Sequence, residues 1–124
     1  MSPDLINGDK GWVLLGEKKV NHLVEKDVFQ IKSRDKFTAV RLFIHDKDVE
    51  IEGLEIMLIN GDILKPSIES IINKGDRSRI IELAADGRQL EKITVRYRAK
   101  GKLFSRKGKM QIGGKPRNPN DNIE

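Results

Sequence analysis

Residues 90–99 have the sequence LEKITVRYRA, and this stretch decides the fold class. The apolar side chains of Ile93, Val95 and Tyr97 alternate with polar ones. Successive side chains of an extended strand point to opposite faces, so the three apolar groups share one face. The stretch therefore predicts a β-strand that lies against a hydrophobic core.

The alternation continues outward in residues 37–45, whose sequence is FTAVRLFIH. Val40, Leu42 and Ile44 fall on one side of this predicted strand, and we expect them to face the core. Shorter apolar runs predict further strands at residues 12–15, 27–32 and 78–84. The segment 66–73 also fits helical spacing, but we favour a strand or an irregular edge there.

The run at residues 49–59, VEIEGLEIMLI, alternates in the same way but changes its parity at Gly53. A parity change of one residue is what a β-bulge supplies, so we expect a bulge at this glycine. Asn60 and Gly61 follow directly between apolar residues. This pair is typical of a type I′ hairpin turn, in which both turn residues have a positive φ.

These features together predict seven to nine short strands with no long helix. We therefore expect an all-β fold, an antiparallel β-sandwich of the jelly-roll kind with disordered termini. A chain of 124 residues provides one hydrophobic core. We expect a flexible lead over residues 1–11, the sandwich over 12–99 and a basic C-terminal segment over 100–124.

The composition excludes several kinds of chemistry. The chain has no cysteine, which rules out disulfides, thiolate zinc sites and cysteine nucleophiles. Its two histidines, His22 and His45, lie far apart in the sequence and lack a second metal ligand at a motif spacing. We expect no cofactor and no metal. No apolar run approaches the ~18 residues that a membrane-spanning helix needs.

A hydrolase remains an alternative that would use His45, Asp46 and Asp48. Catalytic carboxylates need separated pKa values in a shielded cleft, and a solvated hairpin explains this acidic cluster better. Trp12 and Tyr97 are the only residues of their types, and both lie in apolar runs. We expect these two rings to be buried rather than displayed for stacking.

The net charge of +5 comes from the end of the chain. Residues 1–98 contain 17 Lys or Arg and 17 Asp or Glu, whereas residues 99–124 contain seven and two. Candidate ligands for an anion or an anionic polymer are Arg77, Arg79, Lys100, Lys102, Arg106, Lys107 and Lys109. Arg77 and Arg79 also fit a charged turn in which Arg79 pairs with a neighbouring carboxylate.

The basic segment has three interpretations. It is a tether for nucleic acid or another polyanion, a solubilising end, or an edge hairpin around Lys107 and Gly108 whose lysines protect the edge from aggregation. We favour the solubilising or edge-strand interpretation. Residues 113–124 are expected to be disordered.

Several ordered segments resemble a family of small bacterial proteins known only as a domain of unknown function. These segments are WVLLG at 12–16, EKDV at 25–28, FTAVRL at 37–42, VEI at 49–51, NG at 60–61 and GDRSRIIEL at 75–83. The resemblance covers about residues 12–99. Because members of this family commonly carry an export signal, it implies a periplasmic or extracellular β-sandwich. It implies no active site.

The leading functional hypothesis is a non-enzymatic binding or interaction module of the bacterial cell envelope. Its partner would be an unidentified protein or polysaccharide, and we expect a monomer. Binding of nucleic acid or an anionic polymer through the basic segment is the alternative, with a hydrolase third. Residues 1–11 lack the basic and apolar regions of an intact signal peptide, so a cytoplasmic location stays open beside a periplasmic or secreted one.

Overall fold

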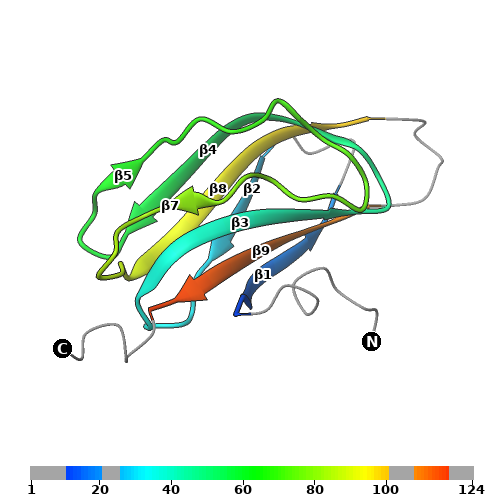
Figure 1. Ribbon diagram of the computed structural model, residues 1–124. Helices are drawn as coiled ribbons and strands as arrows, with labels where there is room; N and C mark the ends of the chain where they lie inside the picture. Colours follow the sequence, from blue (N-terminus) through cyan, green and yellow to red (C-terminus); the bar gives the residue numbers. More distant parts are fainter. Residues whose placement is uncertain (1–10, 21–25, 101–107, 118–124) are drawn as a thin grey trace.

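The computed structural model describes residues 11–20, 26–100 and 108–117, which form nine β-strands and no helix (Figure 1). The strands are β1 (Val13–Lys19), β2 (Lys26–Gln30), β3 (Phe37–His45), β4 (Val49–Leu58), β5 (Ile63–Leu64), β6 (Ile71–Ile72), β7 (Ile81–Glu82), β8 (Leu90–Ala99) and β9 (Lys109–Pro116). Every strand pairing is antiparallel. The predicted all-β fold is therefore confirmed.

The strands form two sheets that enclose one core. Sheet A has the order β1-β9-β3-β7, and sheet B has the order β2-β8-β4-β5, with β6 also paired to β4. Along most of the chain consecutive strands therefore alternate between the sheets, as in a jelly roll. The short strands β5 and β6 share the edge position beside β4.

The period-two pattern of the sequence correctly marks the core. Val40, Leu42 and Ile44 of β3 are buried in it, as are Ile93, Val95 and Tyr97 of β8. Phe29, Ile51, Leu54, Ile56, Ile81, Leu90, Met110 and Ile112 belong to the same cluster. Two sheets packed face to face bury alternate residues in this way.

The second face of β3 is also buried, which the alternation alone does not indicate. Ala39 and Phe43 are buried, and Phe43 has an exposed fraction of 0%. Phe37 belongs to the core cluster because the register with β9 shifts between Phe37 and Ala39. One extra residue reverses the face on which a side chain lies, so Phe37 joins Val40 inside.

The predicted bulge in β4 is confirmed. The register between β4 and β8 shifts between Ile51 and Gly53, which are partners of Tyr97 and Arg96. The shift keeps both Ile51 and Leu54 in the core although they are three residues apart. The parity change at Gly53 in the sequence therefore has the cause that we expected.

The predicted type I′ turn after β4 is wrong. Asp46 is the only non-glycine residue with a positive φ in the described part of the chain, so Asn60 does not have the required conformation. The Gly61 N–H donates to the Leu58 carbonyl oxygen at 2.9 Å, and the Leu58 N–H donates to the Asp62 carbonyl oxygen at 2.8 Å. With Gly61 at a φ of 96°, this is a three-residue loop closed by a left-handed glycine.

Asn60 contributes to that loop through its side chain. Its Oδ1 accepts a hydrogen bond from the Asp62 N–H at 2.9 Å. Asparagine favours turns for this reason as well as for its tolerance of a positive φ. The sequence pair therefore correctly marks a hairpin, but not its turn type.

The C-terminal segment differs most from its prediction. β9 lies between β1 and β3 inside sheet A, so residues 109–116 are neither an edge hairpin nor disordered. Met110 and Ile112 are buried in the core, which extends the sandwich past residue 99 to Pro116. The remaining predictions for the lead, for residues 101–107 and for residues 118–124 lie outside the described residues.

Gly114 explains why β9 looks like a loop in the sequence. A β-carbon at Gly114 would lie 2.6 Å from Leu15 Cδ1 and 2.8 Å from Phe37 Cδ1. These two side chains fill the space above the glycine, so the strand needs a residue without a side chain there. A glycine that weakens the strand signal is thus required by the packing of β1 and β3.

We predict that Gly114→Ala lowers the free energy of unfolding by about 1–3 kcal/mol, because the added methyl group overpacks the core. The matched control is Gly53→Ala, whose β-carbon would meet nothing closer than Arg96 Cδ at 3.7 Å. Urea denaturation measures both variants. Equal destabilisation by the two substitutions would contradict this packing.

We also predict that Ile112→Ala costs about 2–5 kcal/mol of unfolding free energy, because it removes a fully buried side chain from an interior strand. Lys115→Ala on the same strand changes an exposed residue and should stay within about 0.5 kcal/mol. If both variants unfold at the wild-type urea midpoint, β9 is not part of the core.

Candidate functional site

Arg79, one of the predicted anion ligands, uses its guanidinium to hold neighbouring backbone. The group donates hydrogen bonds to the carbonyl oxygens of Ser67 and Ile80. The Arg79 N–H donates to Glu69 Oε2 at 2.7 Å. Arg77 is exposed, and its backbone forms an isolated bridge to Phe43 of β3. These contacts resemble the charged turn of the alternative interpretation, and anion binding by the pair stays a prediction.

Lys100 and Lys109 of the basic segment are paired with carboxylates. Lys100 Nζ lies 3.7 Å from Glu50 Oε1, and Lys109 Nζ lies 3.8 Å from Glu17 Oε1. The other predicted ligands of this segment, Lys102, Arg106 and Lys107, lie outside the described residues. Of the four described candidates, Lys100 and Lys109 thus have carboxylate partners and Arg79 binds neighbouring backbone, and anion binding by the set stays a prediction.

The residues of the hydrolase alternative have separate partners. His45 Nε2 lies 2.7 Å from Gln111 Oε1. Asp48 Oδ1 accepts a hydrogen bond from the Lys74 N–H at 2.8 Å, and Asp46 adopts a φ of 66° in the turn after β3. His45 and Asp48 thus contact different groups, and the hydrolase alternative stays a prediction.

A polar chain crosses the outer face of sheet A. Gln111 Nε2 donates to Glu17 Oε1 at 2.9 Å, so the amide oxygen of Gln111 must face His45. That oxygen can only accept, and His45 Nε2 therefore carries a proton. Gln111 itself has an exposed fraction of 0%. This chain joins three strands that are distant in sequence, so local pattern gave no sign of it.

Trp12 and Tyr97, the only tryptophan and the only tyrosine of the chain, have different surroundings. Tyr97 is fully buried, as predicted, and its hydroxyl donates to Asp27 Oδ2 at 2.7 Å. Trp12 is half-buried outside the core, where its ring meets Phe43 edge to face with centroids 6.4 Å apart. The Arg41 guanidinium lies 5.9 Å from the Trp12 ring, which is within cation–π range.

A groove of about 500 Å³ lies between the edge strands β1 and β2. Its lining residues are Leu14, Leu15, Gly16, Glu17, Lys18, Phe29, Gln30, Lys32 and Ser33. Leu15 and Phe29 supply an apolar floor, and charged or polar groups supply the rim. Binding sites commonly combine an apolar surface with a few polar groups in this way.

The rim and the floor of this groove are in contact. Lys18 Nζ lies 5.8 Å from the centre of the Phe29 ring, within cation–π range. A β-carbon at Gly16 would lie 2.9 Å from Phe29 Cδ2, so the glycine lets β1 approach this ring closely. The floor is thus held in place by the strand beside it.

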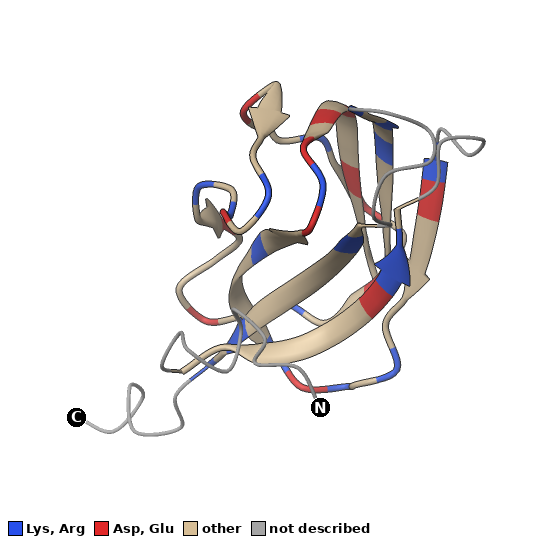
Figure 2. Cartoon of the chain, turned by 90° about the vertical axis from the view of Figure 1, so that its right-hand side faces the viewer, with Lys and Arg blue, Asp and Glu red and all other residues tan. Residues whose placement is uncertain are grey.

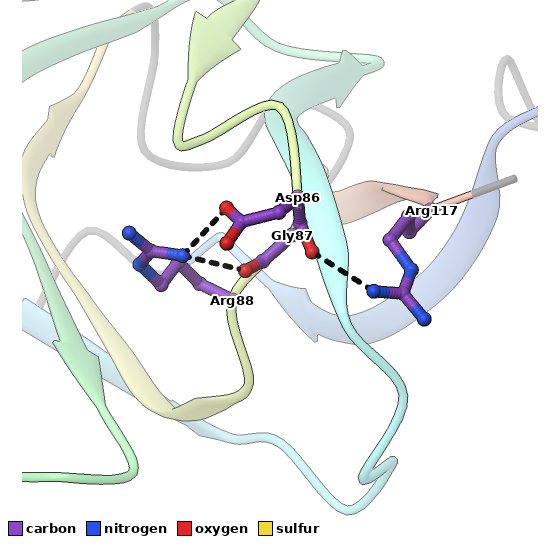
Figure 3. Close-up of polar contacts among 4 residues, drawn as sticks. All are labelled: Asp86, Gly87, Arg88 and Arg117. Atoms are coloured by element: carbon purple, nitrogen blue, oxygen red, sulfur yellow. Dashed lines mark hydrogen bonds and ion pairs between the residues drawn. The ribbon is translucent and has the colours of Figure 1, made fainter. Parts of the chain in front are cut away.

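Cations gather around the turn before β8 (Figure 3). Arg88 Nη1 donates at 2.8 Å to Asp86 Oδ1 and also to the Gly87 carbonyl oxygen. Arg117 Nη1 donates to the Asp86 carbonyl oxygen at 3.4 Å. The hydrogen bond and the charge of Arg88 lower the pKa of Asp86, with a smaller contribution from the charge of Lys36.

Charges elsewhere on the described surface are mixed. Figure 2 shows Lys and Arg interspersed with Asp and Glu along the described chain. On sheet B, Arg98 Nη2 lies 3.3 Å from Glu52 Oε2, and Lys65 Nζ lies 3.9 Å from Glu55 Oε2. Exposed pairs of this kind contribute little stability.

Residues 11–20, 26–100 and 108–117 lack two further features. They contain no group of three or more His, Cys, Asp or Glu side chains that could hold a metal ion. They also contain no helix that is long and apolar enough to cross a membrane.

Comparison with solved structures finds a likeness to a chain of AlgX from Pseudomonas aeruginosa. The two share 15% sequence identity with a TM-score of 0.48, over 81% of this chain. The likeness spans only 25% of the AlgX chain, and it supports no inference about fold or function. No curated protein matches this chain significantly.

The sequence itself matches a protein family over almost its whole length. The match covers residues 2–114, which include all the strands apart from the end of β9. The match extends beyond residues 12–99, the range of the sequence resemblance, and confirms a domain of unknown function. The chain belongs to the family described as Domain of unknown function (DUF2541).

Proposed function

We propose that this chain is a non-catalytic interaction module of the bacterial cell envelope that binds an extended segment of a partner protein. The groove between β1 and β2 carries the proposal, because it is bordered by two edge strands and combines an apolar floor with a polar rim. The family resemblance supports the envelope setting, because members of that family commonly carry an export signal.

An extended segment fits this groove because of the backbone of β1. In the described part of the chain β1 has β9 as its only strand partner, so no described strand pairs with its other edge. Free edges offer backbone N–H and C=O groups to a further strand. A peptide that adds there gains main-chain hydrogen bonds, and pockets for its alternate side chains give specificity.

The side chains of the groove add chemical selectivity. Leu14, near the start of β1, has an exposed fraction of 47% and offers an apolar contact beside the floor. Lys18 and Lys32 outnumber Glu17 along the rim. The groove therefore favours a segment that carries an apolar side chain next to an acidic one.

A polysaccharide is the competing occupant, because sugar rings also stack on apolar floors. The edge of β1 favours a peptide, since only a peptide backbone matches the spacing of its donors and acceptors. Binding of a polyanion through Lys102, Arg106 and Lys107 stays a prediction for residues outside the described ranges.

The test uses single-cysteine labels, which are specific because the chain has no cysteine. A fluorophore at Gln30→Cys reports on the groove, and one at Glu52→Cys on exposed sheet B is the matched control. A library of short acidic–apolar peptides should shift the emission of the groove label alone. Lys18→Glu with Lys32→Glu should weaken that response by about threefold to tenfold.

Neutral and acidic oligosaccharides and peptidoglycan fragments form the other arm of the experiment. A response of the groove label to these sugars and not to peptides would contradict a peptide ligand. Equal responses of the two labels would contradict the groove as the binding site.

A further inference from the structure

Lys36 and Arg88 are two cationic residues in the β2–β3 and β7–β8 connections. These connections and the β4–β5 connection lie at the same end of the sandwich, on the left in Figure 1. The Phe37 N–H donates to the Arg88 carbonyl oxygen, and the Arg88 N–H donates to that of Phe37, both at 2.8 Å. The Arg117 N–H donates to the Lys36 carbonyl oxygen at 2.8 Å. The backbone of Arg88 is therefore fixed to Phe37, the residue that follows Lys36, before any ligand arrives.

These two residues share a small pocket of about 170 Å³. Its lining residues are Lys36, Leu58, Ile59, Asn60, Gly87, Arg88 and Gln89. A β-carbon at Gly87 would lie 2.7 Å from Lys36 Cβ, so Lys36 packs directly against the turn that carries Arg88. The pocket thus joins two cations with an apolar wall from the β4–β5 loop.

Both cations keep donors available. The contacts of Arg88 to Asp86 and Gly87 use Nη1 alone, and a guanidinium carries five N–H donors. Its Nε and Nη2 groups make no hydrogen bond within the described residues. The Lys36 ammonium likewise makes no hydrogen bond or ion pair with any described residue. These are the groups that bind anions in charge-assisted hydrogen bonds.

The local charge sets the class of anion. Lys36, Arg88 and Arg117 surround this turn, where the Asp86 carboxylate pairs with Arg88, and the Asp62 carboxylate lies 3.2 Å from Nδ2 of Asn60 in the pocket wall. A phosphate monoester carries a charge of about −1.5 to −2 near pH 7 and three acceptor oxygens. A water molecule takes up ~30 Å³ in the liquid, so the pocket has room for one such group and not for a nucleotide.

We propose that this pocket binds a phosphate group, with Lys36 and Arg88 as its two cationic ligands. Asp86 is a positioning residue that holds the Arg88 guanidinium against the turn through Nη1. Arg117 lies on the opposite side of the turn in Figure 3, so it adds positive charge without touching the ligand. The site is independent of the groove between β1 and β2.

The experiment measures the melting temperature of the full chain and its affinity by calorimetry. Inorganic phosphate and glycerol phosphate are added in separate arms, with acetate and chloride at the same ionic strength. We expect both phosphates to raise the melting temperature above the acetate and chloride values. A larger effect of glycerol phosphate would identify a phosphate ester, and a larger effect of inorganic phosphate the free ion.

Lys36→Gln and Arg88→Gln should each weaken phosphate binding about tenfold, because each removes one charge-assisted contact. Lys74→Gln is the matched control, since it removes an exposed lysine beside Asp48, beyond the other end of β3. Stabilisation by chloride equal to that by phosphate would overturn the proposal, as would an equal loss of affinity in the Lys74 variant.

Discussion

The fold depends on β9 lying between β1 and β3. This strand provides the ladder for both neighbours, and within the described chain β1 has no other strand partner. Met110 and Ile112 complete the inner face of sheet A, while Gly114 leaves space for Leu15 and Phe37. Because β1 and β9 come from opposite ends of the described chain, their pairing closes a very long loop. Strand pairings of such high sequence separation form slowly.

Much of the fold could be predicted because the alternation of apolar and polar residues indicates the long strands from the local sequence alone. The alternation in residues 37–45 correctly predicts β3, and the parity change at Gly53 correctly predicts the bulge in β4. β9 could not be found in this way, since Gly113 and Gly114 look like a loop by composition. A glycine is needed at position 114 because side chains of two other strands fill the space beside it, and such contacts exist only after folding.

The candidate sites also differ in whether the local sequence could indicate them. Arg79 stood out in the sequence as a charged residue beside a turn, but its guanidinium serves the local backbone. Lys36 and Arg88 are unremarkable in the sequence, and the reciprocal bonds between Phe37 and Arg88 bring them together. Side chains fill the sandwich interior, so our proposals place binding at the edge of β1 that no described strand covers and at the loops of one end.

Hydrogen exchange of the backbone amides of β9 tests the closed sandwich most directly. Amides in the core strands of a cooperative domain exchange only through its global opening. The amides of residues 110–114 should therefore include some protected to the same degree as the slowest ones in β3 and β8. Exchange of this whole segment at the rate of an unstructured peptide, while β3 and β8 stay protected, would show that β9 does not hold sheet A together.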